Sequence, residues 1–183
     1  MKLLIASDLH GAAPAVRALA ARVEAEAPDR IILLGDLLYH GPRNDLPHGY
    51  APKEVAPILN GWAGRVTAVR GNCDAEVDQM VLDFPCMADY ALVEVDGHAL
   101  YLTHGHVARM TPDDPPPLSP GDAYLSGHTH VKTLEARDGV LFVNPGSTSI
   151  PKDGSASYAV YERGAFALKS LADGATLREG GWK

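Results

Sequence analysis

The sequence predicts an α/β fold in which two facing, mixed β-sheets are flanked by helices. In the first half, short apolar runs alternate with segments of helical periodicity, as in parallel strands joined by helices. In the second half, apolar runs are joined by short turns that contain glycine, and this pattern is typical of β-hairpins. The length of 183 residues fits one domain, so we expect residues 1–183 to fold as a single domain.

Three buried strands separated by two helices are predicted in the first half, because uninterrupted apolar runs alternate with breakers. The strands are expected at residues 3–6, 31–34 and 66–69. Pro14 suits the first turn of a helix, and the apolar residues after it repeat at helical spacing. A second helix is expected over residues 53–62. Residues 41–52 are rich in proline and glycine, which predicts a long loop.

Three hairpins are predicted in the second half, each around a turn that contains glycine. The turns are expected at Asp96-Gly97, Asp138-Gly139 and Gly164. The paired strands are expected at residues 91–95 and 99–102, 134–136 and 140–143, and 157–162 and 166–171. Residues 111–120 contain five prolines and are therefore expected to form a loop.

Composition and charge narrow the classes of partner. The net charge of −7 and the pI near 5.5 argue against binding extended nucleic acid, which requires a basic surface. A nucleotide-sized substrate is still compatible with the negative net charge, because a bound metal ion can make the electrostatic potential of its site positive. The two cysteines, Cys73 and Cys86, suit a reducing compartment. No apolar run reaches the roughly 18 residues of a membrane span, so we expect a cytoplasmic protein without a membrane partner.

Polar side chains follow each predicted strand of the first half at the point where the strand ends. Asp8 and His10 follow the first strand, Asp36 follows the second, and Asn72 follows the third. Because the carboxyl ends of parallel strands meet at one edge of a sheet, we expect these side chains to converge. Each motif alone has a simpler interpretation, as a helix-capping or strand-end turn. Their joint occurrence favours a ligand site.

Two histidine pairs in the second half offer further ligands, His104 with His106 and His128 with His130. If the second pair lay on a strand, both rings would point to the same side. Taken alone, such a pair in a loop is more often exposed to solvent. Together with carboxylate and amide oxygens, the imidazoles suit two divalent ions such as Mn, Fe or Zn. Two ions match the hydrolysis of phosphate esters, in which the protein must mainly neutralise and position charge.

In chain order, the motifs D-x-H, G-D, G-N-x-D, H-G-H and G-H-x-H resemble the signature of the calcineurin-like metallophosphoesterases. They read Asp8-Leu9-His10, Gly35-Asp36, Gly71-Asn72-Cys73-Asp74, His104-Gly105-His106 and Gly127-His128-Thr129-His130. Residues 40–52, 68–80 and 144–152 are similar to the corresponding stretches of the YfcE-type bacterial phosphodiesterases. The resemblance covers residues 2 to about 160. It implies the metallophosphoesterase sandwich fold and the hydrolysis of a small phosphodiester.

The resemblance also implies two divalent metal ions, with manganese favoured and Fe, Zn or Ni as alternatives. One ion would be held by Asp8, His10, Asp36 and His130. The second would be held by Asp36, Asn72, His104 and His128, so that Asp36 bridges the two ions. A hydroxide bridging the ions would attack phosphorus. The residues expected to act in catalysis are Asp36, Asn72, Cys73 and His104.

Cys73 departs from the family pattern, because many members have histidine after the G-N asparagine. A thiol with a pKa of about 8.5 is a poor proton donor to a leaving group at neutral pH. We therefore expect weak activity on alkyl monoesters and better activity on diesters with good leaving groups. The alternative interpretation of Cys73 is a small buried side chain beside the site.

Four residues are expected to contact substrate at the mouth of the site: His40, Arg43, Asn44 and His106. An arginine fork fits phosphate oxygens, although Arg43 could also be an exposed loop residue and His106 a turn residue. Asp74 is expected to orient its neighbours, and residues 144–147 to support the site from below.

A non-catalytic scaffold like the retromer subunit VPS29 is the alternative function for this fold. All seven proposed ligands are present in the chain, which favours the enzyme. A nuclease of the same superfamily is disfavoured by the acidic charge. Hairpin edges favour pairing between copies, so a homo-oligomer is expected as a possible state.

Overall fold

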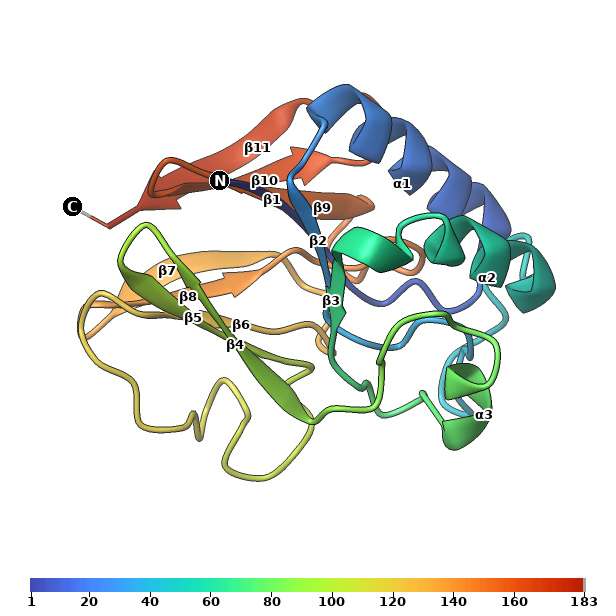
Figure 1. Ribbon diagram of the computed structural model, residues 1–183, viewed down its shortest axis with the longest axis horizontal. Helices are drawn as coiled ribbons and strands as arrows, with labels where there is room; N and C mark the ends of the chain where they lie inside the picture. Colours follow the sequence, from blue (N-terminus) through green and yellow to red (C-terminus); the bar gives the residue numbers. More distant parts are fainter. Residues whose placement is uncertain (183) are drawn as a thin grey trace.

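Two β-sheets face each other, and this arrangement confirms the predicted fold class (Figure 1). The computed structural model describes residues 1–182. The six-stranded sheet has the order β11-β10-β9-β1-β2-β3, and the five-stranded sheet has the order β4-β5-β6-β8-β7. The strands of the first sheet are β1 (Lys2–Ala6), β2 (Arg30–Leu33), β3 (Val66–Ala68), β9 (Ser157–Glu162), β10 (Ala165–Ser170) and β11 (Thr176–Gly181). Those of the second are β4 (Tyr90–Val95), β5 (His98–Thr103), β6 (Ala123–Leu125), β7 (Thr133–Arg137) and β8 (Val140–Asn144).

Parallel pairing brings the ends of several strands to the same edge. β1 pairs in parallel with β2, and β2 with β3, as the alternation of strands and helices predicts. In the second sheet β5, β6 and β8 are also parallel neighbours. The three predicted hairpins are present as β4-β5, β7-β8 and β9-β10. The turn Asp96-Gly97 has φ values of 51° and 84°, the backbone that two-residue hairpin turns require.

The core has two layers, one on each face of the six-stranded sheet. Leu3 and Ile5 point towards the second sheet, where they pack among side chains such as Leu102 and Val143. Leu4 points to the opposite face, as strand alternation requires. Helices α1 (Ala13–Glu26) and α2 (Pro52–Asn60) cover that face (Figure 1). The short helices η1 (Ala63–Arg65) and α3 (Glu76–Gln79) complete the helical elements of the described residues.

The outer face of the five-stranded sheet is covered differently. Tyr101, Tyr124, Val140 and Phe142 form a separate buried cluster there, and Leu118 packs on it. Leu118 belongs to the proline-rich stretch 111–120, which forms a loop as predicted. Within the described residues, the helices thus flank the first sheet, whereas a loop covers the second.

Some element boundaries differ from the sequence prediction. Helix α2 ends at Asn60 instead of residue 62, because Gly61 follows it. β11 was not predicted, since its sequence T-L-R-E-G-G lacks alternating apolar residues. β6 ends at Leu125, so His128 and His130 lie in the turn beyond the strand. The alternation expected for a strand therefore does not apply to these two rings.

Candidate metal centre

Turns from both sheets meet beyond the carboxyl ends of their strands. Asp8 follows β1, Asp36 follows β2 and Asn72 follows β3, while His104 follows β5 and His130 lies beyond β6. The two aspartates and the two histidines have at most 3% of their surface exposed. The Asn72 side chain is exposed at the edge of the group. The convergence predicted from the sequence is thus present in the structure.

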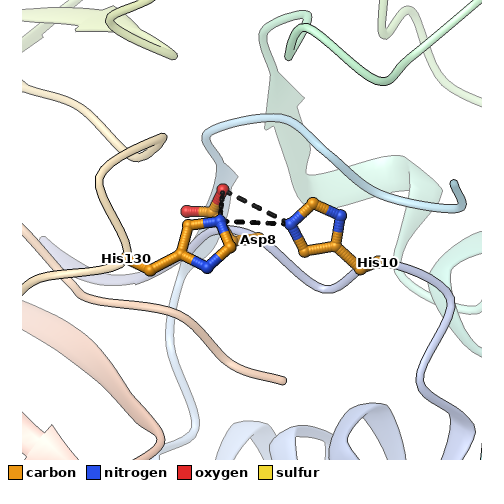
Figure 2. A group of neighbouring side chains, drawn as sticks. All are labelled: Asp8, His10 and His130. Carbon is orange, nitrogen blue, oxygen red and sulfur yellow. Dashed lines mark hydrogen bonds and ion pairs between the residues drawn. The ribbon is translucent and has the colours of Figure 1, made fainter. Parts of the chain in front are cut away.

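Asp8, His10 and His130 form the first half of the centre (Figure 2). His130 Nε2 lies 3.2 Å from Asp8 Oδ1 and 3.3 Å from His10 Nε2. The opposite ring nitrogens are 2.9 Å from the Tyr39 carbonyl for His10 and 2.8 Å from the Ile150 carbonyl for His130. A carbonyl only accepts, so each Nδ1 donates, and the Nε2 atom of each ring faces inwards.

Asp36 and His104 form the second half. His104 Nε2 lies 3.4 Å from Asp36 Oδ2, and His10 Nε2 lies 3.7 Å from the same oxygen. His104 Nδ1 donates to the Leu34 carbonyl at 2.6 Å, so its Nε2 also faces the centre. Asp36 Oδ2 is therefore positioned between the two halves, where a bridging carboxylate would lie.

Asn72 and His128 lie at the outer side of the second half. Asn72 Oδ1 is 3.3 Å from His104 Nε2, and its amide donates to Cys73 Sγ at 3.1 Å. The ring centroid of His128 lies 5.2 Å from that of His104. His128 and His130 thus flank opposite halves of the centre. Among the described residues, five of the seven predicted ligands place donor atoms in tight clusters: Asp8, His10, Asp36, His104 and His130.

The donor set fits a cation. Asp8 Oδ1 is buried and has no hydrogen-bond partner among residues 1–182, although inward-facing imidazoles surround it. Burial alone would raise the pKa of Asp36, but His104 outweighs this effect and holds the pKa below its usual range. Burial would lower the pKa of His104, but Asp36 and Asp8 raise it to about 9. The two carboxylates raise the pKa of His104, so the buried cluster favours positive charge, which a metal ion would supply.

Backbone geometry at these turns is unusual. Asp8, His10, Asp36, His128 and His130 have φ values of 56°, 46°, 54°, 67° and 59°. Residues other than glycine seldom adopt this left-handed region, and each such residue costs on the order of 1 kcal/mol. The fold holds five strained residues in one place, which is a common feature of functional sites.

Neighbouring side chains hold the strained turns in place. The buried Asp74 carboxylate accepts from the backbone N–H groups of Asp36, Leu37 and Gly71, each at 2.7 Å. Ser147 Oγ donates to the Asp8 carbonyl at 2.9 Å. The orienting role of Asp74 and the supporting role of residues 144–147 are therefore confirmed.

A polar cavity of about 250 Å³ lies over the centre. Arg43 and Asn44 line it, as expected for substrate contacts, but His40 and His106 do not. His40 packs instead between the rings of Tyr39 and Tyr50. His106 lines a neighbouring cavity.

Sequence reasoning missed one residue of the polar cavity. Lys152 lines it and adds a second cation to that of Arg43. The supporting role expected for this segment covered only residues 144–147, and Lys152 lies five residues beyond them.

Cys73 lies beside the centre with its thiol buried. Burial raises the pKa of this thiol well above its usual range, and the neighbouring Asp36 raises it further. The group therefore remains a neutral thiol at physiological pH. A neutral thiol of this kind is a poor proton donor, as the sequence suggested.

Two facing mixed sheets with an Asp-His cluster at their strand ends define a metallophosphoesterase fold. Residues 1–164 match the family model of the calcineurin-like phosphoesterase superfamily domain. The chain therefore belongs to this superfamily.

Comparison with two relatives shows where in the superfamily the similarity is strong and where it is limited to the fold. The chain is 45% identical to the phosphodiesterase YfcE of Escherichia coli over 174 residues, which are 94% of each chain. The solved structure of YfcE, a phosphoesterase from E. coli, superimposes with a TM-score of 0.96 at 42% identity over the whole of both chains. Wild-type Vps29 of Entamoeba histolytica, solved with zinc, has a TM-score of 0.65 at 18% identity over both chains and shares the fold alone.

One further property follows from the helices themselves. Within residues 1–182, none of the helices has the length and apolar character needed to cross a membrane.

Proposed function

We propose that this protein is a phosphodiesterase that uses two divalent metal ions, with manganese as the preferred ion and Fe, Zn or Ni as alternatives. The observation that carries this proposal is the buried cluster in which three imidazoles turn their Nε2 atoms towards two carboxylates. The 45% identity to a protein named phosphodiesterase supports the choice of a diester. A small, soluble diester in the cytoplasm is the proposed substrate.

Each ion has a proposed set of ligands. Asp8, His10, Asp36 and His130 would hold one ion, and Asp36, Asn72, His104 and His128 would hold the other. When bound, such a pair supplies positive charge and a hydroxide nucleophile held between the two ions. The position of Asp36 Oδ2 between His10 and His104 supports a bridging role for this carboxylate.

Other side chains would bind and orient the diester. Arg43 and Lys152 place two cations at the polar cavity, where they can pair with the phosphate oxygens. Asn44 Nδ2 donates to the His40 carbonyl at 2.8 Å, which stabilises the loop that carries Arg43. Arg43→Ala is expected to raise KM and to leave the metal content unchanged.

Metal reconstitution tests the proposal. The protein stripped with a chelator and reloaded with manganese should contain two ions per chain and should hydrolyse bis(p-nitrophenyl) phosphate. Asp36→Ala and Asn72→Ala should abolish turnover, whereas Asp45→Ala, at an exposed loop position, serves as the control. Turnover that survives Asp36→Ala, or a fully loaded protein that hydrolyses no diester, would contradict the proposal.

The alternative of a non-catalytic scaffold receives less support. Its basis is the likeness to Vps29, which extends to the fold alone. Inactive protein with two bound ions would favour this alternative.

A further inference from the structure

A second cavity adjoins the proposed metal centre on the side of His128. Its volume is about 500 Å³, and it lies between the outer face of β6, β7 and β8 and the loop that follows His104. His128 lines both this cavity and the 250 Å³ polar cavity over the centre. The two cavities are therefore neighbours on either side of the His128 side chain.

The floor of the larger cavity is aromatic. The rings of Tyr124 and Phe142 lie with centroids 5.2 Å apart, and both residues are buried. The guanidinium carbon of Arg137 lies 4.4 Å from the centroid of Phe142. Arg137 thus lies over the Phe142 ring and is itself exposed at the cavity, where its guanidinium plane offers a surface on which a flat aromatic group packs well.

Two hydrogen bonds hold the covering loop of the cavity in place. Tyr124 Oη donates to the Met110 carbonyl at 2.6 Å, and Arg137 Nη1 donates to the Pro112 carbonyl at 2.9 Å. These two bonds connect the covering loop to β6 and to β7. A preformed pocket binds with a smaller loss of conformational freedom than one that must first be ordered.

Polar atoms lie at the same cavity. His106 is part of its wall, and His106 Nδ1 is buried without a hydrogen-bond partner among residues 1–182. Asp113 adds a carboxylate from the covering loop. A ligand with a hydrogen-bonding edge could satisfy these groups while its face packs on the aromatic floor.

We propose that this cavity binds an aromatic ring carried by one of the two ester arms of the phosphodiester substrate. The inference rests on the proposed function and specifies the class of substrate, which is an aryl or a nucleoside ester. A larger groove of about 610 Å³ between α2 and α3 competes for the same role. It shares no lining residue with the polar cavity, whereas the cavity beside His128 does.

Matched phosphonates test the inference by binding. Phenylphosphonate and methylphosphonate share the phosphonate group and differ in the ring, and neither is hydrolysed at an ester bond. Isothermal titration of the manganese-loaded protein is expected to give a dissociation constant about tenfold lower for phenylphosphonate, because its ring is removed from water. Adenosine 5′-monophosphate and ribose 5-phosphate form a second pair, which distinguishes a nucleoside from a simple aryl group.

Two variants locate the ring. Thr133→Trp fills the cavity from a half-buried strand position and should remove the preference for phenylphosphonate, with methylphosphonate binding unchanged. Phe142→Leu keeps most of the buried volume and should reduce the preference, because the aromatic floor is lost. Val77→Trp, which fills the groove between α2 and α3, is the matched control and should have no effect.

The outcomes separate the two proposals. If methylphosphonate and phenylphosphonate bind the wild type equally, or if Val77→Trp alone removes the preference, the inference about the cavity is overturned while the phosphodiesterase remains. If the loaded protein hydrolyses no diester but keeps its preference for the phenyl ring, the proposed reaction fails and the cavity assignment stands.

Discussion

Single glycines decide whether the turns that carry the proposed ligands can approach one another. A Cβ placed on Gly71 would lie 2.1 Å from Asp36 Oδ1 and 2.3 Å from the Asp36 backbone nitrogen. Neither of these two atoms can move away, because Asp36 is buried and its backbone N–H donates to Asp74. The close approach of β2 and β3 at this point therefore requires a residue without a side chain.

Gly71→Ala is expected to lower the free energy of unfolding by about 2 kcal/mol and to weaken metal binding sharply, because the added methyl displaces Asp36. Chemical denaturation and metal analysis measure the two effects. Gly64→Ala is the matched control, since no atom lies within 4 Å of its added Cβ. Equal behaviour of the two variants would show that the approach at Gly71 is less tight than the structure indicates.

Cys73 is expected to limit the range of leaving groups. Its buried thiol stays protonated and is a weak acid, so an alkoxide leaving group receives little help. Cys73→His should improve the rate for alkyl esters relative to aryl esters by about tenfold or more, because an imidazole transfers protons near neutral pH. Cys73→Ala should leave the ratio of the two rates unchanged. An unchanged ratio in Cys73→His would refute the assignment.

At the scale of elements, the last residue of α1 joins this helix to the first sheet. Glu26 accepts from Lys2 of β1 at 2.7 Å, from Tyr158 of β9 at 3.0 Å, and from Lys169 of β10. Burial would raise the pKa of Glu26, but these three donors outweigh burial and lower the pKa to about 2. The ionised carboxylate thus stabilises the fold, although an acid at a helix C-terminus opposes the helix dipole.

Glu26→Gln is expected to lower the free energy of unfolding by about 2 kcal/mol at pH 7. Because the folded pKa lies below the unfolded value of 4.5, the stabilisation is complete above pH 4.5 and disappears as the pH falls towards 2. Urea denaturation between pH 7 and pH 2 should therefore show the two proteins converging. Glu24→Gln, at an exposed position of the same helix, should match the wild type throughout.

Which elements the sequence could predict depends on how they are buried. β1 and β2 lie between two layers, so their apolar runs are uninterrupted and easily recognised. β11 lies at the edge of its sheet with mostly exposed residues, so its position depends on pairing with β10, which local sequence does not record. The turn at His128 and His130 likewise depends on tertiary contacts, since local sequence does not specify the left-handed backbone of both residues.

At the scale of the whole molecule, the proposed metal ions would link the two sheets. Asp8 and Asp36 belong to turns of the six-stranded sheet, whereas His104 and His130 belong to turns of the other. A ligand that binds only the folded state stabilises it by a free energy that grows with the logarithm of the ligand concentration, about 2.7 kcal/mol at one hundred times its Kd. Metal binding and folding are therefore expected to be coupled in this chain.

Manganese at one hundred times its Kd is expected to raise Tm by roughly 5–10 °C relative to protein in a chelator. Calorimetric scans with manganese and with the chelator measure this difference. Asp36→Asn should lose most of the increase, because it removes the charge shared by both halves of the centre. Identical Tm values with and without manganese in the wild type would contradict a link between the sheets.

The site was more predictable than the cavities around it. Five ordered motifs place Asp8, Asp36 and the histidines at strand ends, and parallel strands necessarily bring such ends together. The assignment of each residue to a metal ion stays a prediction. The pocket over Phe142 could not be predicted, because it arises where the proline-rich loop crosses a distant sheet face. Lys152 was overlooked because its approach to the centre depends on a turn far along the chain.

Left-handed turns at the proposed metal centre lower the stability of the fold, but they place side chains where the proposed chemistry needs them. They occur at Asp8, His10, Asp36, His128 and His130. Glycine at any of these positions would relax the backbone but delete a proposed ligand, so each gain in stability would be made at the expense of the proposed chemistry. A lineage released from the need to hydrolyse its substrate would therefore be expected to lose this cluster early, while keeping the surrounding sheets.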